Sequence, residues 1–437
     1  MKNKANLNQQ LKRKSLQTDR LLEFFTEKEL TTQIGQDKER WTPALLKELI
    51  DNGLDECEKS NIQPRIDISI TDNSFSVADN GSGLTKATIE KSLNYAIRVS
   101  DKNYYISPTR GQLGNALKCI YAAPFIADGY GRVEIETRKT HYLIEVTLDR
   151  IAQKPVIKLT QKESDRTKGV KITVYYKNSA CLLGLAKSDD FYKKTISATD
   201  LLAAYATLNP HATFTLGQKR FEATVSQWGK WNASNPTSPH WYTQELLRDL
   251  IAAYLANNHD KTIREFISEF RGLSSSQKQK IVTDKVEAHG RLSELVINGD
   301  IDEARIQHLL LAMQEETIPV KPQQLGIIGK DHIVSSMEKY YGVKAEKVQY
   351  KKITGLDNNL PHIIEIAFGI KTAEHEREGR SVVCGLNWSP TLGIPINEFR
   401  QMLGEMRIDV HDPVCIVMHI ARPKFNFIDR GKGVLHV

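Results

Sequence analysis

The sequence predicts an α+β fold in three domains, two of mixed helix and strand separated by one that is all helical. Segments that alternate or are rich in β-branched residues, as strands are, occur between residues 41 and 225 and again after residue 317. Between residues 243 and 315, apolar residues recur instead with helical periodicity. The stretch GKWNASNPTSPH (229–240) is rich in Asn, Ser and Pro, which is typical of a linker.

These patterns set the expected boundaries. We expect a flexible basic arm over 1–20, a first α/β domain over 21–228, a helical domain over 229–316 and a second α/β domain over 317–437. The expected strands are IDISI, FSVAD, VEIETRKTHYLIEVTLD, KPVIKLTQ, VKITVYY, PHIIEIAFGI and PVCIVMHIA. The expected helices of the middle domain are ELLRDLIAAYLANN, TIREFISEF, SSSQKQKIV, RLSELVI and DEARIQHLLLAM.

Composition excludes several classes of protein. The chain has 437 residues, of which 40% are hydrophobic, enough for a core in each domain. It contains no run of about 18 apolar residues, so we expect no membrane span, and its basic N-terminus lacks the apolar core of a secretory signal. Its five scattered cysteines favour a reduced cytosol over disulfides or a zinc site. The net charge of +7 permits a polyanionic partner, and the expected location is cytoplasmic, or nucleoid-associated in a prokaryote.

The stretch ELIDNGLDE (48–56) predicts a helix with an unusual polar edge. Thr42 followed by Pro43 is a start signal, an N-cap and then proline at the first helical position. Glu48, Asn52 and Asp55 follow at i, i+4 and i+7 and form one strip beside the apolar face. The strip is either a solvated polar edge, or a carboxylate base beside an amide that holds a hydrated cation. The helix alone does not decide between them.

Two glycine-containing stretches extend the pattern. VADNGSGL (77–84) places Asp79, Gly81 and Gly83 directly after a strand, where an aspartate can accept a hydrogen bond from an exocyclic amine. TRGQLGNALK (109–118) places Gly111 and Gly114 before an apolar helix, where backbone N–H groups can hold a phosphate. Each stretch alone is a common turn. The ordered set of E-x-x-x-N helix, D-x-G-x-G strand end and glycine loop within about 70 residues is far more specific.

This set resembles the GHKL (Bergerat) ATP-binding sandwich of type II topoisomerases, MutL proteins, chaperones and histidine kinases. KELIDNGLDECEKSNIQP looks like the corresponding helix of the B subunit of DNA topoisomerase VI. TIREFISEF and SSQKQKIV look like its helix-two-turn-helix domain, IPVKPQQLGIIGKD like the start of its transducer domain, and HIARPKFNFIDRGKG like the segment with its ATP-sensing lysine. The resemblance runs from about Leu21 to Val437. It therefore implies a GHKL domain, a helix-two-turn-helix-like domain and a transducer-like domain.

The resemblance implies a role for each matching residue. Glu48 would be the general base, Asn52 would bind Mg²⁺, and Asp79 would accept from the adenine amino group. Gly81 and Gly83 would make room for the base, and Asp55 would brace the pocket. The phosphate-binding lid would comprise Gly111, Gln112, Leu113, Gly114 and Asn115. Lys432 is the expected transducer lysine that contacts the γ-phosphate, with Lys424 as the alternative.

Three features depart from the family pattern. Ala116 stands where topoisomerase VI has a further glycine of the lid, and Val170 follows Gly169 where a threonine is usual. CGLNWSPTLGIP (384–395) replaces an arginine- and asparagine-rich strand. The sequence also ends soon after Lys432, so the long C-terminal stalk helix is expected to be absent, either because this is a fragment or because the protein is a short relative.

The function implied is that of the Mg²⁺-dependent, ATP-hydrolysing subunit of a type IIB topoisomerase-like complex. ATP would close a homodimer around double-stranded DNA, and a partner resembling the topoisomerase VI A subunit would cleave the DNA. The alternative is a MutL-like nucleotide-gated clamp without topoisomerase activity. A histidine kinase would explain neither the helical domain nor the transducer.

Other motifs carry less weight. GIIGKD (326–331) lacks the glycine spacing and the Ser/Thr of a P-loop, and the twelve histidines show no metal-site spacing. Trp228, Trp231 and Trp241 are expected to pack the helical domain onto its neighbour rather than to stack on bases. The helical domain also carries lysines that either contact DNA phosphates or form a solvated surface: Lys278, Lys280 and Lys285.

Overall fold

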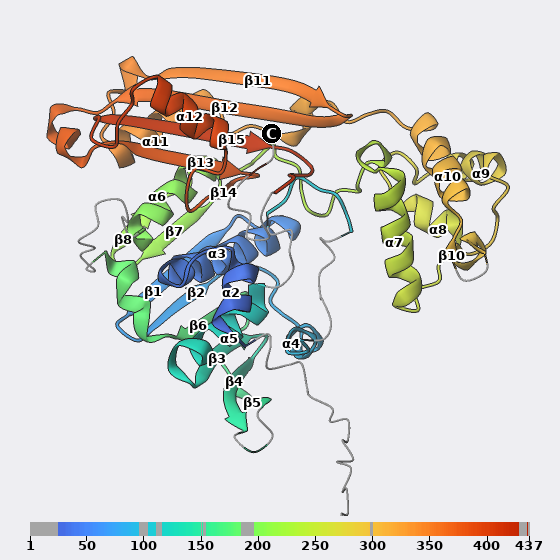
Figure 1. Ribbon diagram of the computed structural model, residues 1–437, viewed down its shortest axis with the longest axis horizontal. Coiled ribbons are helices and arrows are strands. Elements are labelled where there is room, and N and C mark those ends of the chain that lie inside the picture. Colours follow the sequence, from blue (N-terminus) through green and yellow to red (C-terminus); the bar gives the residue numbers. More distant parts are fainter. Residues whose placement is uncertain are drawn as a thin grey trace, which may run out of the picture.

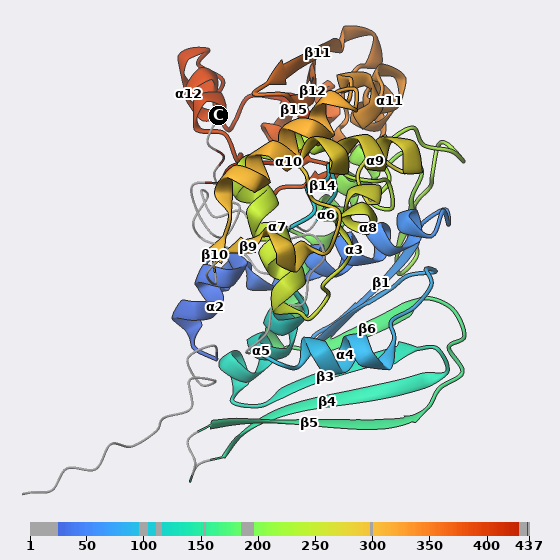
Figure 2. The same cartoon turned by 90° about the vertical axis from the view of Figure 1, so that its right-hand side faces the viewer.

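The computed structural model describes residues 25–95, 104–110, 116–149, 151, 154–184, 196–297, 300–427 and 435 (Figure 1). The expected arm over 1–20 lies outside these residues. An eight-stranded mixed sheet lies below a five-stranded sheet, and the helices between residues 244 and 315 stand to one side of both (Figure 1, Figure 2). The protein is therefore a mixed helix-and-strand fold with a large mixed sheet. The domain boundaries expected from the sequence remain predictions.

The eight-stranded sheet has the order β5-β4-β3-β6-β2-β1-β7-β8. Its strands are β1 (Arg65–Thr71), β2 (Ser74–Ala78), β3 (Gly131–Thr137), β4 (Thr140–Asp149), β5 (Lys154–Glu163), β6 (Val170–Tyr175), β7 (Thr213–Leu216) and β8 (Lys219–Phe221). All neighbours are antiparallel except β1 and β7. The first five stretches expected to be strands form β1 to β6. Short-period alternation thus located these strands correctly.

Helices cover one face of this sheet, because every second residue of its strands is apolar. In β1 the side chains of Ile66 and Ile68 are buried while their neighbours are exposed. They meet the apolar faces of α2 (Glu27–Ile34), α3 (Trp41–Lys59), α5 (Ala116–Asp128) and α6 (Ala198–Leu208) in one core. The shorter elements η1 (Lys38–Arg40), η2 (Lys177–Leu183) and α4 (Lys86–Ser92) complete this part of the chain.

The start of α3 differs from the prediction. Thr42 is not its N-cap: the helix begins at Trp41, and Arg40 in the cap position makes no side-chain capping bond. The preceding 3₁₀ turn η1 runs straight into α3, so the chain is already helical one residue earlier. Pro43 still falls in the first turn, where a missing N–H group leaves no helical bond unmade.

The region after the linker is mainly helical, with one short hairpin. It comprises η3 (Pro239–Trp241), α7 (Gln244–Ala256), α8 (Ile263–Ser268), α9 (Ser276–Lys285), η4 (Leu292–Leu295), β9 (Val296–Ile297), β10 (Asp300–Ile301) and α10 (Glu303–Glu315). The prediction that this region is all helical, with RLSELVI as a helix, is wrong. The β-branched pair Val296 and Ile297 turns back to pair with β10 instead of continuing the helical turn of η4.

The linker is packed rather than loose. Trp231 and Trp241 are buried in the helical core with ring centroids 5.0 Å apart. That they pack the helical domain onto its neighbour stays a prediction. Trp228 stacks on His211 at 4.6 Å. Lys278 donates to the backbone carbonyl of Glu316, and Lys285 pairs with Glu316 and its neighbour Glu315, so both lysines hold α9 against α10.

The second sheet has the order β11-β12-β15-β13-β14. Its strands are β11 (Gln349–Asp357), β12 (Leu360–Ile370), β13 (Ser381–Leu386), β14 (Ser389–Pro390) and β15 (Val414–Ala421). The helix α11 (Lys330–Tyr341) packs on one face and α12 (Asn397–Glu405) on the other, which explains why every residue of β15 is buried. The 3₁₀ turns η5 (Pro322–Leu325), η6 (Ala345–Lys347) and η7 (Ala373–Glu378) connect these elements.

The two sheets are joined through α6. Leu208 at its end belongs to the core beneath the five-stranded sheet. A Cβ placed on Gly385 of β13 would lie only 2.6 Å from the Leu208 side chain, so the strand and helix are in close contact. Within the described residues, no helix combines the length and apolarity needed to cross a membrane.

Gly169 gives a prediction for the fold. A Cβ at this position (φ +66°) would lie 1.8 Å from the Asp79 carbonyl oxygen, whereas a Cβ at Gly217 (φ +57°) would meet nothing within 4 Å. We expect Gly217→Ala to cost about 1–2 kcal/mol of unfolding free energy, from its backbone conformation alone. Gly169→Ala should cost at least about 3 kcal/mol, because β6 must also move away from Asp79. Equal losses in denaturant unfolding of the two variants would contradict the close packing at Asp79.

Candidate functional site

A cavity of about 520 Å³ opens between α3, the ends of β2 and β6, and the linker. Its volume is within the range of about 300–1,000 Å³ typical of sites for small organic ligands. Its apolar wall consists of Leu49, Val77, Leu84, Ile106, Leu117, Val170 and Ile172. A flat apolar group such as an aromatic ring would therefore be desolvated against this wall.

Asp79 lies on this cavity at the end of β2. Its Oδ1 accepts hydrogen bonds from the backbone N–H groups of Gly81, at 2.8 Å, and Val170, at 3.2 Å. Its Oδ2 receives no hydrogen bond from any described residue. Burial raises the pKa of the carboxyl to about 6, and these backbone donors only partly offset the effect. Asp79 is thus a fixed acceptor that faces the cavity with one oxygen.

Gly81 and Gly83 allow close packing within the loop that follows Asp79 and leave the lining of the cavity to other residues. Neither Gly81 nor Gly83 lines the cavity. A Cβ on Gly81 would lie 3.1 Å from Asp79 Oδ1, and one on Gly83 (φ +86°) would lie 2.7 Å from Thr137 Oγ1. Gly53 of α3 does line the cavity, and a Cβ there would lie 3.1 Å from that of Asp79. Gly53 was not predicted as a site residue from the sequence, although its place directly after Asn52 was a usable signal.

The polar strip on α3 is partly in the site. Asn52 is exposed and lines the cavity together with Asp55 and Glu56. Glu48, one turn earlier, has a side chain that is 32% exposed and lies 4.0 Å from Lys47, but it is not part of the cavity lining. The structure therefore brings Asn52 and Asp79 to one cavity and leaves Glu48 one helical turn beyond it.

Two cations line the cavity among the described residues, Lys59 and Lys118. Lys118 is 3% exposed, and its ammonium group lies 5.7 Å from the centre of the Tyr95 ring. A buried ammonium group at a ligand cavity favours an anionic ligand. No group of three or more His, Cys, Asp or Glu residues suited to a metal ion occurs in the described part of the chain.

The other predicted site residues are not placed in the cavity. Gly111, Gln112, Leu113, Gly114, Asn115 and Lys432 lie outside the described residues. Lys424 is described and half-buried, and it does not line the cavity. Burial lowers the pKa of its ammonium group, and the charged group that opposes this effect is Glu245, on α7 of the helical region.

One wall of the cavity could not be predicted from the sequence. It is formed by residues of the segment 104–110, the linker and the residue that follows α8: Tyr105, Ser107, Thr109, Ala233, Asn235, Pro236, Thr237 and Glu269. Thr237 donates to the carbonyl of Ile106 at 2.8 Å. These residues come from distant parts of the sequence, so neither periodicity nor spacing could have indicated that they meet.

Comparison with known proteins does not identify the chain. No protein-family model matches it, and no curated protein matches it either. Among solved structures, the ATPase region of Saccharomyces cerevisiae topoisomerase II is similar with a TM-score of 0.39 and 10% identity, over 90% of this chain and 76% of that chain. A TM-score this low does not establish a shared fold.

The raised pKa of Asp79 predicts how ligand binding depends on pH. Because its pKa in the folded protein is about 6, Asp79 is ionised at pH 7.5 and becomes protonated as the pH falls through 6. A ligand amine that donates to the carboxylate should therefore bind up to tenfold more weakly for each pH unit below about 6. Calorimetric titration with adenosine, which has no phosphate that titrates in this range, measures the effect. Asp79→Asn should abolish it, and an unchanged profile in that variant would show that Asp79 is not the group responsible.

Proposed function

We propose that this chain binds ATP with Mg²⁺ and hydrolyses it. The observation that carries the proposal is the meeting of Asn52 and Asp79 on one cavity of about 520 Å³. In the sequence the end of α3 and the two strands β1 and β2 separate these residues. The resemblance to the GHKL pattern implies roles for them at opposite ends of an adenine nucleotide. A solvated polar edge would not require Asn52 to face a cavity shared with a half-buried aspartate.

The apolar wall and Asp79 together suit adenine. The ring would lie against the apolar residues of β2, β6 and α3, while its amino group donates to Asp79 Oδ2. Guanine carries a carbonyl oxygen at the equivalent position, which the carboxylate would repel. Asp79 would therefore select adenine over guanine nucleotides.

The cationic and amide groups suit the phosphates. Asn52 would hold Mg²⁺ through its amide oxygen, and Lys118 would offset phosphate charge within the cavity. When bound, Mg²⁺ neutralises charge that develops on the phosphates during transfer. Gly111, Gln112, Leu113, Gly114 and Asn115 follow directly after the cavity wall 104–110, and their backbone N–H groups are proposed as the phosphate-binding lid.

Hydrolysis needs a group that orients water. Glu48 is our choice, because it lies one helical turn from Asn52 on the same side of α3 and remains accessible to water. Lys432 is proposed to contact the γ-phosphate. Lys424, the alternative, does not line the cavity and would have to move towards it to do so.

The biological role proposed is that of a nucleotide-gated dimer that acts on double-stranded DNA. ATP would close two copies of the chain, and hydrolysis would reopen them, with DNA cleavage carried out by a partner that resembles the topoisomerase VI A subunit. A MutL-like clamp without a cleaving partner is the alternative. The resemblance in the sequence supports the first, and the altered stretch CGLNWSPTLGIP favours the second.

Substitution of Glu48 tests the enzymatic part of the proposal. We expect Glu48→Gln to lower the rate of phosphate release by about 100- to 10,000-fold, because the general base is lost. The affinity for a non-hydrolysable ATP analogue should stay within about threefold, because Glu48 does not line the cavity. Glu90→Gln, on the exposed face of α4, is the matched control and should hydrolyse ATP normally.

Light scattering on the same proteins tests the dimer. The analogue should double the mass of wild type and of Glu48→Gln, and ATP should hold Glu48→Gln in the dimeric state. Wild-type activity in Glu48→Gln would remove Glu48 from the mechanism. Absence of nucleotide-dependent mass change would contradict the gated dimer, whether or not ATP is hydrolysed.

A further inference from the structure

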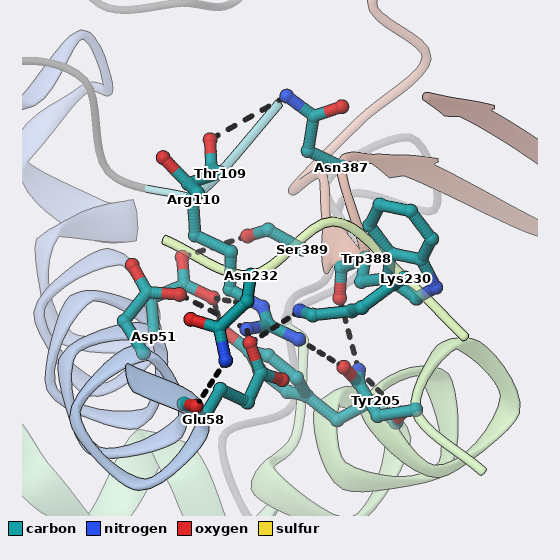
Figure 3. Close-up of polar contacts among 12 residues, drawn as sticks. Asp51, Glu58, Thr109, Arg110, Tyr205, Lys230, Asn232, Asn387, Trp388 and Ser389 are labelled. Atoms are coloured by element: carbon teal, nitrogen blue, oxygen red, sulfur yellow. Dashed lines mark hydrogen bonds and ion pairs between the residues drawn. The ribbon is translucent and has the colours of Figure 1, made fainter. Parts of the chain in front are cut away.

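A buried cluster of charged residues surrounds Arg110, which directly follows the cavity-lining Thr109 (Figure 3). The guanidinium group of Arg110 is fully buried, and its Nη1 lies 3.0 Å from Asp55 and 2.8 Å from Glu58. Its Nε lies 3.9 Å from Asp51, and its Nη2 donates to Asn209 at the end of α6. The three carboxylates stand at i, i+4 and i+7 on α3, beside the strip that faces the cavity.

The charges in this cluster balance. Lys47 pairs with Asp51 at 2.8 Å, and Lys230 of the linker pairs with Glu58. With Arg110, three cations therefore face three carboxylates. Burial lowers the pKa of His211, which contacts Glu58 at 2.8 Å, to about 4, so this histidine adds no charge near neutral pH. Loss or displacement of any one cation would leave an uncompensated buried carboxylate.

The turn between β13 and β14 reaches into the same cluster from the five-stranded sheet. Ser389 donates to Asp51 at 2.7 Å, and the carbonyl of Trp388 accepts from Asn209 at 2.9 Å. Asn387 donates to the carbonyl of Thr109, the residue before Arg110, at 3.4 Å. Figure 3 shows this turn and Arg110 meeting over α3. The residues of the turn that make these contacts belong to CGLNWSPTLGIP (384–395), the stretch that departs from the family pattern.

The segment 104–110 is held on its other side by the helical region. Tyr242 donates to the carbonyl of Tyr104 at 3.0 Å and accepts from the N–H group of Ile106 at 3.2 Å. Residues of this segment, including Ile106 and Thr109, line the cavity. The segment 104–110 therefore connects two parts of the protein. One end contacts the helical region, and the other contacts the charged cluster on α3 and the five-stranded sheet.

We propose that Arg110 is a positioning residue that couples occupancy of the cavity to the β13–β14 turn of the five-stranded sheet. This inference rests on the proposed nucleotide binding. A ligand that draws the cavity wall towards itself moves Thr109 and Arg110 relative to Asp51, and the hydrogen bonds of Ser389 and Asn387 respond. By reciprocity, a change at the turn alters the affinity for the ligand.

A purely structural role would give a different result. Neither Ser389 nor Arg110 lines the cavity, so a substitution that only weakens packing would lower the melting temperature and leave the affinity of the folded protein unchanged. Coupling would change the affinity itself. Ser389→Ala is the sharper variant, because it removes one hydroxyl group and leaves all six charges in place.

The test measures the dissociation constant of a non-hydrolysable ATP analogue with Mg²⁺ by calorimetry, on the full chain. The variants are Ser389→Ala, Arg110→Lys and the control Ser336→Ala. Ser336 is a buried serine on α11, the helix that packs on the five-stranded sheet, and it does not contact the charged cluster. We expect Ser389→Ala and Arg110→Lys each to raise the dissociation constant about 5- to 50-fold, and Ser336→Ala to change it less than about twofold.

Hydrogen exchange supplies the second measurement. In wild type, saturating analogue should change the exchange of residues 384–390, and Arg110→Lys should lose that change while still binding the analogue. The coupling is overturned, and nucleotide binding stands, if Ser389→Ala and Arg110→Lys bind the analogue as tightly as Ser336→Ala does and hydrogen exchange of residues 384–390 is the same with and without the analogue. If wild type binds no adenine nucleotide, the proposed function fails and this inference fails with it.

Discussion

The arrangement of this protein depends on the burial of Arg110 among three carboxylates of one helix. A buried guanidinium group and three buried carboxylates are tolerated only because each charge lies beside an opposite charge, and because neutral groups from α6 and the β13–β14 turn add hydrogen bonds to them. Removal of one partner from such a cluster typically costs about 3–5 kcal/mol. The same contacts fix where the segment 104–110 and the linker run, and these two segments form a wall of the cavity.

The helix α3 therefore has two polar strips with different tasks. One strip, with Glu48 and Asn52, faces the cavity or its edge. The other, with Asp51 and Glu58, faces Arg110, and Asp55 belongs to both because it lines the cavity and pairs with Arg110. A helix with carboxylates in this density would be poorly stable alone. Its apolar side, buried against the eight-stranded sheet, supplies the packing that holds both strips in place.

Much of the fold followed from local patterns, and the site followed only in part. Segments that alternate or are rich in β-branched residues located β1 to β6, β12 and β15. Alternation arises where one face of a sheet is buried, whereas β15, which is buried on both faces, is a nearly continuous apolar run. The capping signal at Thr42 failed because a preceding 3₁₀ turn had already begun the helix, and helical periodicity failed at RLSELVI because pairing with β10 outweighed it. Asn52 and Asp79 could be chosen because glycines and spacing mark them. Arg110 could not, since its partners lie 52 to 99 residues away and Asn387 meets Thr109 across 278 residues.

Competition between ATP and GTP for the cavity tests the central claim most directly. The claim is that Asp79 and the apolar wall of α3, β2 and β6 form an adenine site. Equilibrium titration at pH 7.5 with Mg²⁺ should show ATP binding at least about 100-fold more tightly than GTP, because only adenine presents a hydrogen-bond donor to the carboxylate. Equal affinities for the two nucleotides, or no binding of ATP, would contradict the account.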